Sequence, residues 1–209
     1  MKLRFVSRII VLALVVVVGG GILLHNHTQA ANPPRASSRT LQGTLLNDPA
    51  PAFTLRDQTG ASVSLAALRG RPVVLTFLYT HCPDVCPLTA EKLHTTAQAL
   101  GADAAKVSWL AVSIDPSGDT PASATAFVAA HHLIGRLQFL LGGASQVSPV
   151  WNAYHIPVQP EPASPGKPTV VDHLLGLYLI DGAGQERVYM GDDFDPAVLS
   201  ADLRLLMAS

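Results

Sequence analysis

Two cysteines stand four residues apart in the segment 79–87, Tyr-Thr-His-Cys-Pro-Asp-Val-Cys-Pro, and the 209-residue chain contains no others. Paired thiols suit either a soft metal ion or thiol–disulfide exchange. If the backbone is helical here, the Cβ atoms of Cys82 and Cys86 lie about 5–6 Å apart on one face. A relaxed disulfide needs about 3.8 Å, so bridging them requires a local adjustment. Two sulfur donors are too few for a metal ion, which would need a third ligand from elsewhere.

The segments on either side place this pair at a strand-to-helix corner. The apolar run Pro72–Tyr79 predicts a buried strand, and Leu88–Leu100 predicts a helix with Pro87 in its first turn and Gly101 at its C-terminal cap. Because a helix N-terminus stabilises negative charge, at least one thiol should have a lowered pKa. Asp84 lies between the thiols and is expected to oppose that shift.

Eight histidines are candidates for the third ligand. His173 lies in Val-Val-Asp-His-Leu (170–174), where a proline-rich loop meets a predicted strand and can bring an imidazole to the thiolates. Spacing alone leaves this open, because a core histidine fits the same pattern; Asp172 beside it is interpreted either as orienting the ring or as a strand-end or exposed residue. The others are interpreted as structural or exposed: His25, His27, His81, His94, His131, His132 and His155.

The N-terminus predicts export. Lys2, Arg4 and Arg8 precede the uncharged run Ile9–Leu24, the pattern of a signal sequence. Residues 1–30 are interpreted as a signal anchor, with a cleaved signal peptide as the alternative, and residues 31–47 as a tether. The chain is thus predicted to be a single-pass protein of the inner (cytoplasmic) membrane with residues 48–209 on the periplasmic or other extracytoplasmic side.

The charge balance argues against nucleic acid as a partner. Eleven Lys and Arg remain beyond residue 30, fourteen less the three before it, against 15 Asp and Glu, a net charge of about −4.

Strand and helix patterns alternate along the rest of the chain. Strands are expected at 53–55, 62–65, 72–79, 107–114, 137–141, 174–180 and 186–190, and helices at 88–100, 122–131, 144–154 and 196–207. The segment 156–168 has five prolines and is expected to be irregular. Asp115 and Asp119 are interpreted as turn and helix-cap residues outside the site. This order predicts an α/β sandwich around a mixed sheet.

Three motifs in order resemble the Sco/SenC family: Tyr-Thr-His-Cys-Pro-Asp-Val-Cys-Pro at 79–87, Ser-Ile-Asp-Pro at 113–116 with Asp-Thr-Pro at 119–121, and Val-Asp-His at 171–173. The resemblance spans about residues 48–207. It implies a thioredoxin-like fold, membrane tethering, and one copper ion, Cu(I) or Cu(II), bound by Cys82, Cys86 and His173. It also implies a role in assembling the binuclear copper centre of cytochrome c oxidase, with its copper-accepting subunit as partner and other copper carriers as further partners. Relatives often have arginine where His81 stands, and a small polar residue where Leu174 stands.

The leading interpretation is therefore a metallochaperone rather than an enzyme. The alternative is a thiol–disulfide oxidoreductase in which Cys82 and Cys86 form the redox pair and keep the cysteines of the target copper site reduced. Three alternatives are weaker. A peroxidase is disfavoured because the corner has no arginine, and a structural disulfide because a domain of this size does not need one to fold. A zinc site is also less favoured than a copper site.

Overall fold

The computed structural model describes residues 40–158 and 176–208. Within them, strands β1–β8 lie at Thr44–Leu45, Thr54–Arg56, Ser62–Ser64, Val73–Leu78, Ser108–Ser113, Leu137–Leu140, Gly176–Ile180 and Glu186–Gly191. Helices α2–α5 lie at Val85–Leu100, Pro121–Ala130, Ala144–Ala153 and Pro196–Met207, and the 3-10 helices η1 and η2 at Leu65–Leu68 and Gly101–Lys106. The predicted alternation of strands and helices is confirmed.

One six-stranded sheet of order β1-β8-β7-β4-β5-β6 forms the centre of the molecule. Strands β4, β5 and β6 are parallel, while β7 pairs antiparallel with both β4 and β8. Strands β2 and β3 form a separate hairpin. This mixed sheet confirms the predicted α/β sandwich.

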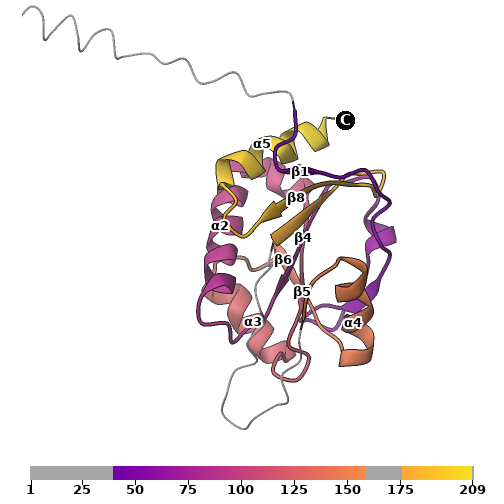
Figure 1. The fold of residues 1–209 in the computed structure, drawn as a ribbon. Helices are drawn as coiled ribbons and strands as arrows, with labels where there is room; N and C mark the ends of the chain where they lie inside the picture. The colour runs from indigo at the N-terminus through magenta and orange to yellow at the C-terminus, as the bar shows by residue number, and fades with distance from the viewer. Residues whose placement is uncertain (1–39, 159–175, 209) are drawn as a thin grey trace, which may run out of the picture. The chain divides into compact units, whose positions relative to one another are not determined.

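Helices cover both faces of the sheet, with α2, α3 and α5 on one side and α4 with η1 on the other (Figure 1). All six residues of β4 and all six of β5 are buried, as expected for central parallel strands between two helical layers. Helices α3 and α5 begin at capping residues, where the side chains of Thr120 and Asp195 accept the backbone N–H groups of Ser123 and Ala197. These layers fix the corner after β4, where the cysteines lie.

Strand β1 and the start of α2 differ from the prediction by more than the shifts of one or two residues at other boundaries. Strand β1 pairs with the edge of β8 at residues 44–45, inside the range interpreted as a tether, because a two-residue strand is too short to show a period. Helix α2 begins at Val85 rather than Leu88. Pro87 is tolerated there because a helix does not use the backbone N–H groups of its first turn. Cys86 is therefore inside the helix.

No helix in residues 40–158 and 176–208 is long and apolar enough to cross a membrane. The predicted membrane segment 1–30, residues 31–39 of the predicted tether and residues 159–168 of the proline-rich segment lie outside the described residues.

Phe77 anchors the aromatic core on the α4 side of the sheet. Its ring is fully buried, with its centre 5.7 Å from that of Tyr154 and 6.4 Å from that of Tyr178. Phe77→Ala is expected to lower the free energy of unfolding by about 3–5 kcal/mol, since it leaves a cavity in a packed core. Urea denaturation would measure this. The control Ile134→Ala, at a side chain that is 75% exposed, should change the free energy by about 0.5 kcal/mol or less; equal losses would contradict the packing argument.

Candidate metal centre

Cys82 and Cys86 lie where β4 leaves the sheet and α2 begins. Cys82 is in the connecting turn, where its N–H donates to the carbonyl of Tyr79 at 3.4 Å, and Cys86 is the second residue of α2. Both are free thiols, and both are buried. The structure therefore brings the two predicted sulfur donors together, reduced, at one corner.

The N-terminal turn of α2 directs its donors at Cys82. The backbone N–H of Cys86 donates to the Cys82 sulfur at 3.4 Å. The pKa of Cys82 is lowered to about 5, chiefly because the Cys86 thiol hydrogen-bonds to it. The backbone N–H groups of Asp84 and Cys86 and the Tyr79 hydroxyl add to this, while burial opposes it. The predicted low-pKa thiol is confirmed, and the backbone N–H of Asp84 contributes to the lowering, while the opposing effect expected of its carboxylate stays a prediction.

The pKa of Cys86 is shifted in the opposite direction. Its hydrogen bond to Cys82 and its burial raise its pKa well above the usual range. Burial, with the hydrogen bond and charge of Cys82, likewise raises the pKa of Tyr79. At neutral pH the site is thus a thiolate at Cys82, supported by a protonated thiol at Cys86 and a neutral phenol at Tyr79.

Asp119 positions this corner, although the sequence interpretation kept it outside the site. One carboxylate oxygen accepts the backbone N–H and hydroxyl of Thr80 at 2.8 and 2.7 Å, and the other accepts the hydroxyl of Ser113 at 2.5 Å. Burial raises the Asp119 pKa despite these bonds. Thr80 is two residues before Cys82, so the carboxylate ties the cysteine turn to the end of β5. The helix cap is Thr120, and the neighbouring Asp115 forms a turn as predicted, accepting from Ser117 and Gly118.

The described histidines have other contacts. His81 is exposed, and its Nδ1 lies 3.1 Å from the hydroxyl of Thr80. His94 contacts the carbonyl of His132, and His131 pairs with Glu91. His173 and Asp172 lie outside the described residues. In the part of the chain that the structure describes, no three His, Cys, Asp or Glu side chains are grouped to hold a metal ion.

The site is therefore a buried pair of thiols at the end of a central strand in an α/β sandwich. The family model SCO1/SenC matches residues 42–208. The chain belongs to the SCO1/SenC family. The SCO2 homolog of Homo sapiens is 30% identical over 159 residues, which cover 75% of this chain and 59% of the human protein. The Bos taurus SCO2 homolog is 34% identical over 134 residues, 63% of this chain and 50% of that protein. The chain thus spans only about half the length of these mitochondrial SCO relatives.

Solved structures agree with the SCO1/SenC assignment. Bradyrhizobium japonicum ScoI, solved with copper bound, is 32% identical, has a TM-score of 0.67, and aligns over 75% of this chain and 98% of ScoI. The solution structure of apo Sco1 from Thermus thermophilus is 29% identical with a TM-score of 0.67, over 79% of this chain and 96% of that one. The fold of this SCO1/SenC chain is therefore thioredoxin-like, as the resemblance implied.

Proposed function

We propose that this chain is an exported, membrane-tethered protein that binds copper and delivers it to the binuclear copper centre of cytochrome c oxidase. The observation that carries the proposal is the buried pair of free thiols, Cys82 and Cys86, in which the backbone N–H of Cys86 donates to the Cys82 sulfur at 3.4 Å. Membership of the SCO1/SenC family supports it, as does the copper bound to the similar ScoI of Bradyrhizobium japonicum.

The donor set fits copper(I) as cargo. Thiolates are soft ligands that favour Cu(I), and Cys82 supplies one without losing a proton. Cys86 must release its proton when it becomes a ligand, so binding should liberate protons and strengthen as pH rises. His173 is proposed as the third ligand through one ring nitrogen, with Asp172 accepting from the other. One ion per chain follows from one such set.

The proposed location follows from the N-terminal pattern. Residues 1–30 would anchor the chain in the inner membrane and residues up to the start of β1 would tether it, with the thiol site on the extracytoplasmic side. The proposed acceptor of the copper is the subunit of cytochrome c oxidase that holds the binuclear centre, and other copper carriers are proposed as sources.

The different ionisation of the two cysteines also favours a second candidate, a thiol–disulfide oxidoreductase. The Cys82 thiolate would attack a disulfide of the target and release one target thiolate. The Cys86 thiol would then lose its proton and attack the mixed disulfide, which releases the second target thiol and leaves a Cys82–Cys86 disulfide. The target is reduced by two electrons and the pair is oxidised by two.

Copper stoichiometry of the full chain in a neutral detergent tests the proposal. The reduced wild type is expected to hold one copper per chain after buffer exchange. His173→Ala and Cys86→Ser should each weaken copper binding more than about 100-fold, because loss of a direct ligand costs more than loss of a residue behind one. His81→Ala is the matched control and should bind normally, since its imidazole is exposed and hydrogen-bonds only to Thr80 among the described residues.

Disulfide reduction by the same samples separates the two candidates. A wild type that retains no copper, yet reduces a disulfide substrate as fast as His173→Ala does, would overturn the copper proposal and leave the oxidoreductase. Copper binding that survives in His173→Ala would remove His173 from the ligand set.

A further inference from the structure

Cations gather at the end of the sheet opposite the thiols. Five of the eight Lys and Arg in the described residues belong to this basic end: Arg69, Arg71, Lys106, Arg136 and Arg187. Each lies just before a strand or at the start of one. Strands β4, β5 and β6 are parallel, so their first residues share an edge, and β7 ends and β8 begins beside them. The cysteine corner follows the other end of β4.

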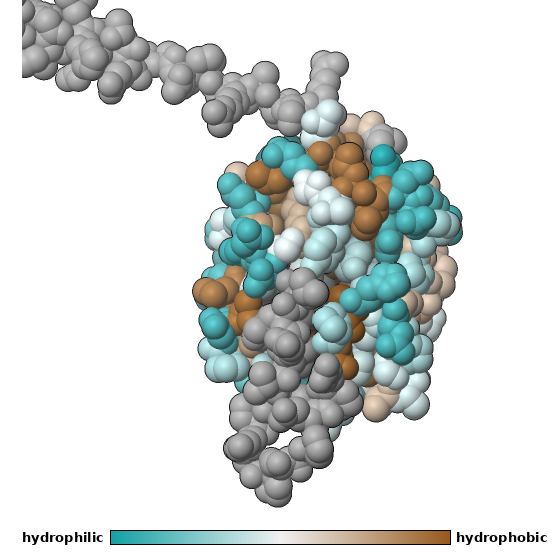
Figure 2. Space-filling model, viewed as in Figure 1, coloured by the Kyte–Doolittle hydropathy of each residue, from teal (hydrophilic) through white to brown (hydrophobic). Residues whose placement is uncertain are grey.

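A cavity of about 680 Å³ opens in this basic end. Its wall includes Arg71, Lys106 and Arg187, which come from three separate segments, together with backbone of the turn between β7 and β8. Figure 2 shows hydrophilic residues gathered over the upper right of the molecule, where Figure 1 places that turn. Three cationic side chains around one cavity suit an anion.

Two of the three cations around the cavity are paired with a carboxylate, Arg187 with Asp181 and Lys106 with Asp103, while Arg71 has no ion-pair partner among the described residues. Among the described residues, Asp181 is the one acid in the cavity wall, and it also accepts from two backbone N–H groups. Asp103 pairs with Lys106 at 2.7 Å, but both side chains are largely exposed, so an anionic ligand competes easily with that pair. Asp57 lies toward Arg136, in the wall of a neighbouring cavity that shares Arg71, and it accepts from Thr59, Ala61 and Gln138.

Arg187 has donor capacity that the described residues leave unused. One terminal nitrogen donates to Asp181 at 3.0 Å, while Nε is buried and has no hydrogen-bond partner among the described residues. A planar guanidinium with free donors suits the oxygens of a phosphate group, which accept two parallel hydrogen bonds.

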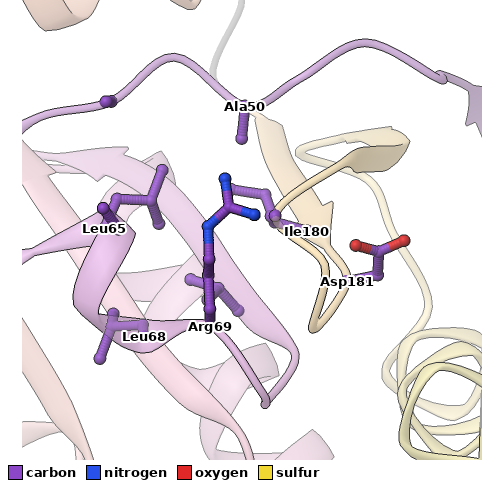
Figure 3. A pocket seen from close by; sticks show the side chains of 10 residues that line it. Ala50, Leu65, Leu68, Arg69, Ile180 and Asp181 are labelled. Atoms are coloured by element: carbon purple, nitrogen blue, oxygen red, sulfur yellow. The ribbon is translucent and has the colours of Figure 1, made fainter.

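Arg69 adds a further charge to the same end. Its guanidinium lies across a small pocket between Ala50, Leu65 and Ile180, while the Asp181 carboxylate points away from it (Figure 3). Arg69 donates to the carbonyl of Ala183 in the turn between β7 and β8 at 2.7 Å. Its charge is therefore held beside the cavity, and no carboxylate of the described residues forms an ion pair with it.

We propose that the basic end binds a phosphate group, and that this phosphate belongs to an anionic phospholipid of the membrane to which the chain is tethered. The proposal rests on the membrane tether in the proposed function. The chain beyond residue 30 is acidic overall, so a local excess of cations gives it one end that an anionic surface attracts. Such contact would leave the thiol corner facing away from the lipid.

The path of the chain agrees with this assignment. The backbone N–H of Gln42, near the start of the described chain, donates to Asp202 of α5 at 2.9 Å. Leu206 and Met207, at the end of the same helix, line the cavity. Figure 1 shows the first described residues beside α5, so the described chain begins near the basic end.

Titration of the full chain, held in a neutral detergent, with soluble short-chain phospholipids tests the proposal. Calorimetry should show phosphatidylglycerol binding at least about tenfold more tightly than phosphatidylcholine, with the difference falling as salt is added. Arg71→Gln and Lys106→Gln should each weaken phosphatidylglycerol binding about fivefold, the factor expected for one cation near an anionic surface. Arg56→Gln, which removes a cation outside the basic end, should change nothing.

Three results would overturn the proposal. Equal affinity for the two lipids would show that the charge of the lipid does not matter. If Arg56→Gln lost as much phosphatidylglycerol affinity as Arg71→Gln, the binding would not be located at the basic end. Inorganic phosphate that binds as tightly as phosphatidylglycerol and competes with it would leave a site for a free anion, not for lipid. Copper stoichiometry measured on the same samples reports separately on the proposed function, so the failure of one is distinguishable from the failure of the other.

Discussion

Replacing Cys86 with Ala is expected to move the ionisation of Cys82 from about pH 5 upward toward the ordinary thiol value of 9.0. The thiol of Cys86 is the largest single cause of the lowered pKa, and alanine removes that donor. Cys86→Ser keeps a hydroxyl donor at the same place and should restore most of the shift. The ultraviolet absorbance of the thiolate, followed against pH on the reduced apoprotein, measures each midpoint.

Tyr79→Phe should raise the Cys82 midpoint by a smaller amount, because the phenol is a lesser donor to the same sulfur. Tyr189→Phe is the matched control, since that half-buried tyrosine lies on β8 and its ring contacts Tyr178. Cys82→Ser must abolish the transition near pH 5. If the low transition remained in Cys82→Ser, the thiolate would have to be assigned to Cys86.

The same pKa predicts how stability depends on pH. Between about pH 5 and the unfolded value of 9.0, the unfolded chain keeps the Cys82 proton that the folded chain has lost. The free energy of unfolding of the wild type should therefore rise with pH relative to Cys82→Ser across that window, and the gain is lost as pH falls through 5. Above pH 9 the raised pKa of Cys86 acts in the opposite direction. Urea denaturation at several pH values checks the sign.

Replacing Asp119 with Ala is expected to lower the free energy of unfolding by about 2–4 kcal/mol, because it leaves buried donors without their acceptor. The donors are the N–H and hydroxyl of Thr80 and the hydroxyl of Ser113. The cysteine turn also loses its tie to β5, so copper affinity should fall about 10–100-fold, as for other residues that hold a ligand in place. Asp119→Asn retains an acceptor for Thr80 and should show the smaller effect in both measurements.

Asp115→Ala is the control that separates the effect of Asp119 on the position of the cysteine turn from its effect on the stability of the fold. Asp115 is also buried, but among the described residues its carboxylate accepts hydrogen bonds only from Ser117 and Gly118 in its own turn. It should destabilise the fold while leaving copper affinity and the Cys82 ionisation close to those of the wild type. An equal loss of copper binding in Asp115→Ala and Asp119→Ala would show that the effect of Asp119 comes from general destabilisation.

Local sequence determined much of the secondary structure of this protein and the position of its two cysteines. The apolar run at 72–79 was enough to predict β4, and the i, i+4 spacing of the two cysteines placed both sulfurs at one corner, because strand and helix periods act over a few residues. Gly101 predicted the end of α2, because a helix cap is satisfied by neighbouring backbone groups. The ordered motifs were sufficient to predict the family.

Only the tertiary structure decided which distant residues meet. Thr80 and Asp119 are 39 positions apart, and they bond because β4 and β5 are parallel neighbours whose ends share an edge. Strand β1 exists because the edge of β8 offers backbone groups to pair with, which no pattern at 44–45 records. The pKa split between Cys82 and Cys86 likewise depends on burial and on where each donor points. Side chains far apart in sequence acquire a common environment only when the sheet places them together, and that placement is not local information.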